Sequence, residues 1–451
     1  ALQAGTDMDM VSCGFLNTLE ESLKEGKVTE EQINAACRRV LEAKYKLGLF
    51  SDPYKYCDTL RVEKELYTTA HRAVARKIAA ETFVLLKNED HLLPLERKGK
   101  IALIGPMADA RNNMCGMWSM TCTPSRHGTL LEGIRSAAGD KAEILYARGS
   151  NIYHDAELEK GGAGIRPLER GNELQLLDEA LHTAARADVI VAALGECAEM
   201  SGESASRTEL GVPDAQQDLL KALVKTGKPV VLLLFTGRPL VLNWEDANVH
   251  SILNVWFGGS ETGDAIADVL FGKVTPGGKL TTTFPRSVGQ LPLYYNHLNT
   301  GRPDPDSHSF NRYSSNYLDM SNEPLYPFGY GLSYTNFSYG NLQLSSDVLS
   351  KNGELTVSVT VTNDGDFDGY EIVQMYLHDI YAEISRPVKE LKGFERIFLK
   401  KGESREVKFV ITEDDLRFYN SGLQYVYEPG EFDVMVGANS RDVQTERFRA
   451  D

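Results

Sequence analysis

Four carboxylates gather in one short segment that shows neither helical nor strand periodicity. The segment is "LGECAEMSGESASRTEL", residues 194–210, and its carboxylates are Glu196, Glu199, Glu203 and Glu209. A carboxyl group on an accessible loop can give and take a proton, and cleavage of a glycosidic bond uses one carboxyl as the acid and another as the nucleophile or base. The segment therefore predicts a loop for proton transfer, with a solvated acidic loop as the alternative.

The position of this loop favours the chemical interpretation. It directly follows the apolar run 188–195, "DVIVAALG", which is typical of a buried strand. Ligands of open α/β sheets bind at the carboxyl ends of the strands. The loop is also much longer than the usual connection of about 4 to 6 residues, and such long loops are usually functional.

Other sequence motifs of catalytic or metal-binding sites are incomplete or absent. "DGDFDG", residues 364–369, imitates the start of a calcium loop, but Met375 stands where a bidentate Glu is needed, so a hairpin turn is predicted there. "GKVTPGGKL" lacks the first Gly and the Ser or Thr of a phosphate loop, and the chain contains no H-E-x-x-H and no G-x-S-x-G. No metal and no cofactor is therefore expected.

The six cysteines form no C-x-x-C pair and stand near no paired histidines, so zinc-ligand spacing is absent. Whether Cys115 and Cys122 form a disulfide is left open by the sequence. The net charge of -16 argues against a nucleic-acid partner, because affinity for nucleic acid depends largely on Lys and Arg. No run approaches the roughly 18 apolar residues of a membrane span, so no membrane partner is expected.

The periodicity of the chain predicts an α/β part followed by a β part. Thr29 and Gln32 form a capping box before a helix, so residues 1–66 are expected to be helical with a linker. Over residues 67–284, unbroken apolar runs alternate with amphipathic segments, which predicts a mostly parallel sheet covered by helices on both faces.

The second half of the chain differs from the first in composition and then in periodicity. Residues 285–340 are rich in Pro, Asn, Ser and Tyr, which predicts a long ordered connection. Its aromatic residues are expected to pack across domains, with stacking on sugar as the alternative. Residues 341–451 alternate apolar and polar side chains with a period of two, which predicts a β-sandwich.

Several longer stretches resemble the family 3 glycoside hydrolases, in particular the bacterial periplasmic type of β-glucosidase. They are "GECAEMSGESASRTEL", "KPVVLLLFTGRPL", "WFGGSETGDAIADVLFGKVTPGGKL", "LYPFGYGLSYTNF" and "SRPVKELKGFERIFLKKGES". The resemblance covers nearly the whole chain. It implies the end of a (β/α)8 barrel in residues 1–66, an α/β sandwich domain in 67–284 and a fibronectin type III-like sandwich in 341–451.

Carried over residue by residue, the resemblance places the general acid/base on Glu203. Arg207 stands four residues later, and unless it points elsewhere its charge would oppose the protonated carboxyl that an acid needs. Glu196, at the end of the strand, and Arg207 are expected to support the loop. A second loop, residues 113–128, resembles the family loop that brings Trp118 and Ser119 to the substrate, one to stack on a sugar face and the other to bond a hydroxyl; local packing is the alternative for both.

The resemblance also implies a partner carboxylate that these residues lack. The family's nucleophile is an Asp in a Ser-Asp-Trp or Ser-Asp-His type motif, expected upstream of "AGTDMDM" at the start of the chain. We therefore expect a retaining exo-β-glucosidase whose barrel domain lies outside this sequence, with this part alone inactive. A β-xylosidase and a non-catalytic carbohydrate-binding scaffold remain the alternatives. A periplasmic or secreted location is implied, and a homodimer is left open.

Overall fold

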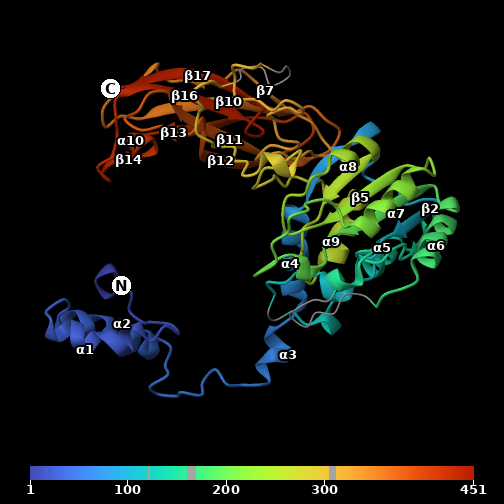
Figure 1. Ribbon diagram of the computed structural model, residues 1–451, viewed down its shortest axis with the longest axis horizontal. Coiled ribbons are helices and arrows are strands. Elements are labelled where there is room, and N and C mark those ends of the chain that lie inside the picture. The colour runs from blue at the N-terminus through green and yellow to red at the C-terminus, as the bar shows by residue number, and fades with distance from the viewer. Residues whose placement is uncertain (120–121, 160–168, 304–310) are drawn as a thin grey trace. The chain divides into compact units, whose positions relative to one another are not determined.

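The computed structural model describes residues 1–119, 122–159, 169–303 and 311–451 (Figure 1). The chain divides into two compact units, Ala1–His71 and Arg72–Asp451. Among the described residues, no helix is both long enough and apolar enough to cross a membrane.

The first unit is helical, as predicted. After the short η1 (Leu2–Ala4) it contains α1 (Gly14–Lys24), α2 (Glu30–Lys46) and α3 (Arg61–Glu65). The predicted capping box is confirmed, because the Thr29 hydroxyl accepts from the Gln32 amide and the Gln32 side chain accepts from the Thr29 amide. An ion pair of 2.6 Å between Asp7 and Arg39 ties the start of the chain to α2.

A six-stranded sheet forms the centre of the second unit, in the order β1-β6-β5-β4-β2-β3. Its strands are β1 (Val84–Asn88), β2 (Lys100–Ile104), β3 (Glu143–Ala147), β4 (Val189–Gly195), β5 (Val230–Phe235) and β6 (Ser251–Asn254). All neighbours pair in parallel except β1, which pairs antiparallel with β6. The predicted mostly parallel sheet is confirmed. Because β2, β4, β5 and β6 run in one direction, the loops that follow them leave the same edge.

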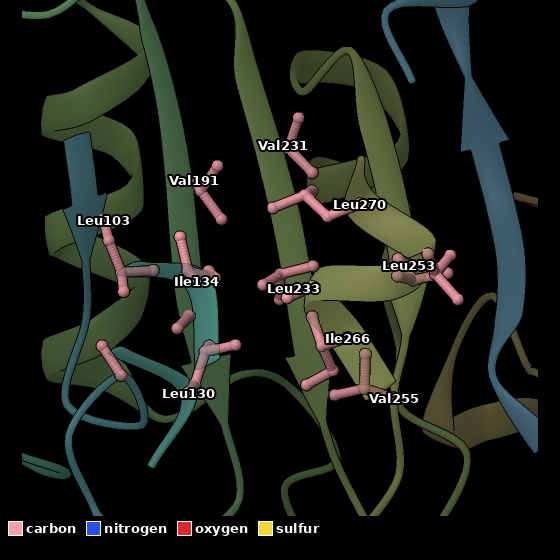
Figure 2. Packing of buried hydrophobic residues seen from close by; sticks show 14 of the residues in the cluster. Leu103, Leu130, Ile134, Val191, Val231, Leu233, Leu253, Val255, Ile266 and Leu270 are labelled. Carbon is pink, nitrogen blue, oxygen red and sulfur yellow. The ribbon is translucent and has the colours of Figure 1, made fainter. Parts of the chain in front are cut away.

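Helices cover both faces of this sheet and bury its apolar strands. One face carries α5 (Leu130–Ala138) and α9 (Thr262–Leu270), and Figure 2 shows side chains of these helices against those of the strands. The other face carries α6 (Glu173–Ala185) and α7 (Asp214–Val224). Two further helices, α4 (Thr69–Thr82) and α8 (Asn243–Asn248), complete this part.

Two glycines allow α5 and α9 to approach closely. A Cβ added at Gly133 would lie 2.5 Å from the Gly263 carbonyl carbon, and one added at Gly263 would lie 2.3 Å from the Thr129 carbonyl oxygen. Real Cβ atoms do not tolerate such contacts. The close packing of these two helices therefore fixes the start of α5, and with it the end of the loop that leads into α5.

The connection over residues 285–340 contains little regular structure where the structure describes it. It holds the short η7 (Val288–Gln290) and β7 (Phe337–Tyr339). The Tyr295 ring stacks on Phe328, with centroids 4.2 Å apart, and meets the ring of Tyr376 in strand β11 (Gly369–Asp379) edge-on at 5.9 Å. These contacts agree with the expectation that aromatic residues of the connection pack across domains.

The C-terminal part is the predicted β-sandwich. One sheet has the order β13-β10-β7, with β8 also pairing with β10, and the other has the order β12-β11-β16-β17-β9. The strands are β8 (Gln343–Leu344), β9 (Val348–Leu349), β10 (Leu355–Asn363), β11 (Gly369–Asp379), β12 (Glu390–Leu399), β13 (Ser404–Ile411), β16 (Gly430–Gly437) and β17 (Val443–Ala450). A short α10 (Glu413–Leu416) and the pair β14 (Phe418–Tyr419) and β15 (Tyr425–Val426) lie outside these sheets.

The prediction of a hairpin turn at 364–369 is wrong. This segment joins β10 to β11, and these strands belong to different sheets, so it crosses from one layer of the sandwich to the other. The alternation of apolar and polar residues is the same on both sides of a hairpin and of a crossover, so the pattern could not distinguish them.

Candidate active site

The long acidic segment, here called the acid loop (residues 196–213), connects β4 to α7. It starts at the carboxyl end of β4, as predicted. Because β4 pairs in parallel with β5, the first residues after β5 lie beside the first residues of the acid loop. The Glu196 amide donates to the Phe235 carbonyl at 2.7 Å, which joins the two strand ends directly.

The Glu196 carboxylate is fully buried and accepts bonds from several directions. Its Oε2 accepts from the Thr236 hydroxyl at 2.9 Å and from the Gly237 amide at 3.1 Å. Its Oε1 lies 2.9 Å from Arg207 Nη1 and 3.0 Å from Arg238 Nε. A buried carboxylate with two guanidinium partners and two further donors is fully compensated, so it can serve as a fixed point of the structure.

Both arginines also hold the backbone of the acid loop. Arg207 Nη2 donates to the Gly211 carbonyl at 3.1 Å. Arg238 Nη2 donates to the Ala205 carbonyl at 2.7 Å and also to the Met200 carbonyl. The loop is therefore attached to Glu196 on both sides of residue 203. This arrangement accounts for the Arg207 side chain, which points to Glu196 and the base of the loop.

Glu203 lies at the exposed tip of the acid loop. Its neighbours Gly202 and Ser204 both have positive φ, 129° and 59°, so the chain turns sharply around it. Within the described residues the Glu203 carboxylate makes no hydrogen bond or ion pair. Both of its oxygens therefore remain available to a group that approaches the loop, which is what a general acid requires.

The tryptophan loop (residues 113–128) follows β2 and reaches the acid loop. A Cβ added at Gly202 would lie 2.9 Å from Met117 Cγ and 3.5 Å from Trp118 Nε1, so these side chains lie against the residue that precedes Glu203. The Trp118 side chain is 71% exposed, which leaves much of its ring free to contact a ligand. Asn113, at the base of the loop, accepts from the Ala198 amide at 2.8 Å.

Ser119 makes a hydrogen bond within the tryptophan loop. Its hydroxyl donates to the Gly116 carbonyl of its own loop at 2.7 Å. The hollow between the two loops, about 650 Å³, is bordered by other residues, namely Cys115, Gly116, Met117, Trp118, Ser201, Gly202, Ser204, Ala205, Ser206, Thr236, Gly237, Arg238, Trp256 and Phe257. Glu203 is not among these residues, although its sequence neighbours Gly202 and Ser204 are.

Two aromatic residues of this hollow were not predicted. Trp256 and Phe257 follow β6, and Trp256 has a φ of 50°. Phe257 lies 2.9 Å from a Cβ added at Gly116, so it supports the base of the tryptophan loop. The signal was present in the sequence, because "WFGG" ends the run 251–259 that is predicted as a strand, and the structure ends that strand at Asn254 and places these residues at the same sheet edge as the acid loop.

The structure joins Cys115 and Cys122 in a disulfide, the pairing that the sequence left open. Their Cα atoms are 6.5 Å apart, and the bond closes the part of the tryptophan loop that contains Trp118 and Ser119. His127 lies beside the two sulfur atoms, and the three side chains form a group of metal-ligating type. Zinc-ligand spacing is absent from the sequence, and His127 meets the pair only through the fold of the loop.

Comparison with known proteins agrees with this architecture. The Glycosyl hydrolase family 3 C-terminal domain matches residues 83–334, and the Fibronectin type III-like domain matches residues 371–440. This chain belongs to glycoside hydrolase family 3. Its α/β part with the acid loop and its β-sandwich are the corresponding domains of that family.

Relatives within the family extend over nearly the whole chain. A periplasmic β-glucosidase of Salmonella typhimurium is 46% identical over 99% of the chain and 59% of the relative. A β-xylosidase of Formosa agariphila is 38% identical over 98% of the chain and 59% of the relative. The crystal structure of a Listeria innocua β-glucosidase in complex with glucose is similar with a TM-score of 0.85 and 37% identity, covering 100% of this chain and 59% of that one. The chain thus spans about three fifths of the length of these family 3 relatives.

Proposed function

We propose that this chain supplies the acid/base side of the active site of a retaining exo-β-glucosidase. The observation that carries the proposal is that the Glu203 carboxylate has no partner among the described residues. Glu203 stands on a loop whose backbone is attached to the buried Glu196 through Arg207 and Arg238. The β-glucosidases of Salmonella typhimurium and Listeria innocua, 46% and 37% identical, support this choice of reaction.

In the proposed mechanism, Glu203 first protonates the oxygen of the leaving group. Substrate that fills the hollow beside Trp118 and Gly202 would exclude water from the site of proton transfer. After a glycosyl-enzyme has formed, Glu203 would act as the base that activates water. The ion pairs of Arg207 and Arg238 with Glu196 support this role, because they direct both guanidinium groups away from the acid.

The second carboxylate of the reaction is proposed to come from the part of the protein that corresponds to the remaining length of the relatives. A retaining enzyme needs a nucleophile about 5 to 5.5 Å from the acid/base. The chain covers 59% of the Salmonella typhimurium relative, which leaves ample length for a further domain. On this account the 451 residues alone cannot complete the double displacement.

Two features support a periplasmic or secreted location. The Salmonella typhimurium relative is a periplasmic β-glucosidase. The disulfide between Cys115 and Cys122 fits an oxidising compartment, since such bonds form and persist outside the cytosol.

A second candidate function is hydrolysis of β-xylosides. The specific observation that favours it is the Formosa agariphila β-xylosidase, which is 38% identical over 98% of this chain. The acid/base chemistry proposed for Glu203 is the same for both sugars, so substrate choice must depend on residues that contact the sugar itself.

The test compares hydrolysis of an aryl β-glucoside and an aryl β-xyloside by the 451-residue chain and by the same chain within its longer protein. We expect activity only in the longer protein, with the β-glucoside preferred. Preference for the β-xyloside would select the second candidate. Activity of the short chain would contradict the proposed division of the site, and inactivity of the longer protein on all glycosides would support a non-catalytic scaffold.

A further inference from the structure

Three side chains of the tryptophan loop converge beside the hollow of the candidate active site. His127 Nε2 lies 3.7 Å from Cys115 Sγ and 3.5 Å from Cys122 Sγ. The imidazole is only 4% exposed, so its nitrogens depend on partners within the protein. The group is therefore enclosed on the histidine side, while Cys115 borders the hollow.

The other ring nitrogen fixes the tautomer of His127. Nδ1 lies 3.2 Å from the Gly128 carbonyl oxygen, which can only accept, so Nδ1 carries the proton. Nε2 then has a lone pair directed at the two sulfurs. A disulfide has no hydrogen to donate, and no other described group donates to Nε2, so this buried lone pair is unsatisfied in the oxidised form.

The separations match those expected around a tetrahedral metal ion. With Zn–S bonds of about 2.3 Å and Zn–N bonds of about 2.0 to 2.1 Å, a sulfur and a nitrogen ligand lie about 3.6 Å apart. The two observed distances of 3.7 and 3.5 Å lie on either side of this value. A histidine that donates its other N–H to a backbone carbonyl is also the usual form of a metal ligand.

We propose that reduction of the Cys115–Cys122 disulfide converts this group into a binding site for one zinc-type divalent cation. A phosphine or dithiol reductant delivers two electrons, the S–S bond breaks, and two protons give two thiols. Binding then releases these two protons, and the metal is held by two thiolates and His127 Nε2, with a fourth position open to water. The sulfurs must move apart to about 3.8 Å, the separation of two thiolates on one zinc ion.

The site goes beyond the proposed glycosidase function, since it contains neither Glu203 nor the residues that hold it. Metal binding at this site can be measured without an assay of hydrolysis. Cobalt(II) is a suitable probe because cobalt in a thiolate site absorbs strongly in the near ultraviolet. The exposed Cys13, Cys37 and Cys57 would bind cobalt adventitiously and are replaced by Ser, which leaves the pair and the buried Cys197.

This triple-Ser protein is reduced with a phosphine, freed of reductant under anaerobic conditions and titrated with cobalt(II). We expect one cobalt ion per chain with a thiolate absorption band, displacement by zinc, and no band in the unreduced protein. Cys122→Ser should abolish the band, and His127→Gln should weaken binding at least tenfold, with Cys197→Ser as the matched control that leaves it unchanged. Absence of the band from the reduced protein, or its persistence in Cys122→Ser, would overturn the proposal.

Discussion

Arg207 Nη1 lies 2.9 Å from Glu196 Oε1, and the two side chains are only 12% and 0% exposed. This buried pair connects the end of β4 to the far side of the acid loop, beyond Glu203. Because the Arg207 guanidinium is engaged by Glu196 and by the Gly211 carbonyl, the loop is held rigidly at its base while its tip stays open.

Glu196→Ala should destabilise the protein severely. The substitution leaves the guanidinium groups of Arg207 and Arg238 without their common carboxylate, and loss of one partner from a buried ion pair costs roughly 3 to 5 kcal/mol. The free energy of unfolding in urea measures the effect. Glu209→Ala, at an exposed position of the same loop, is the control and should change it by less than about 0.5 kcal/mol. Equal values for the two variants would contradict the role given to Glu196.

Gly237→Ala should displace the acid loop, because the new Cβ would lie 1.8 Å from Ser201 Oγ and 2.6 Å from Ser201 Cβ. Overpacking of this kind costs about 1 to 3 kcal/mol. Removing the clashing atoms with Ser201→Gly in the same protein leaves Phe257 Cε2, at 3.5 Å, as the next neighbour. The double variant should therefore recover part of the lost stability. If it is no more stable than Gly237→Ala alone, the clash is not the cause.

Trp118→Ala should raise the KM for an aryl β-glucoside in the longer protein. An aromatic contact contributes about 0.5 to 1.5 kcal/mol beyond its buried area, which corresponds to a change of roughly two- to tenfold. Trp118→Phe keeps an aromatic face and should lie closer to the parent protein. Steady-state kinetics distinguish this role from local packing, since packing alone predicts a loss of stability in urea with an unchanged KM.

Glu245, in α8, should make the protein less stable as the pH rises toward neutrality. Burial raises the pKa of this carboxyl from 4.5 to about 7, against the opposing effects of Lys221 and Gln217. Between these values the folded chain keeps a proton that the unfolded chain has lost, so stability falls as the pH rises through this window and then levels off. The drop is at most about 3 kcal/mol.

Glu245→Gln removes this titration and should flatten the dependence of unfolding free energy on pH between 4.5 and 7 relative to the parent protein. Urea unfolding at several pH values measures it. Glu209→Gln, at an exposed position, serves as the control and should keep the slope of the parent. An unchanged slope in Glu245→Gln would show that another group carries the proton.

The strands and helices that position the site could be predicted because burial on both faces leaves a simple pattern. The runs that became β2, β4 and β5 are almost wholly apolar, and the segments between them have helical periodicity. Strand β1 (Val84–Asn88) was not among the predicted strands, since it is short and follows α4 after a single residue. Its antiparallel pairing with β6 depends on contacts between residues far apart in sequence.

Within the site, the sequence indicated the acid loop but not how it is held. Glu196 and Arg207 were expected to support the loop, yet Arg238 comes from the segment after β5, and only the parallel pairing of β4 with β5 brings it to Glu196. The convergence of His127 with Cys115 and Cys122 likewise depends on the path of one irregular loop, for which no periodicity exists. Such side-chain contacts form only in the folded chain, so sequence patterns could not predict them.

The most direct test of the account is the dependence of Glu203→Gln on the leaving group, measured as kcat/KM for a series of aryl β-glucosides in the longer protein. Poor leaving groups need the proton that Glu203 supplies, so they should lose about 10² to 10⁴ in rate, while the best leaving groups lose little. Glu209→Gln, a change of the same type at an exposed position of the same loop, should leave the series unaltered. Equal loss for all leaving groups, or full activity throughout, would contradict the assignment of Glu203 as the acid.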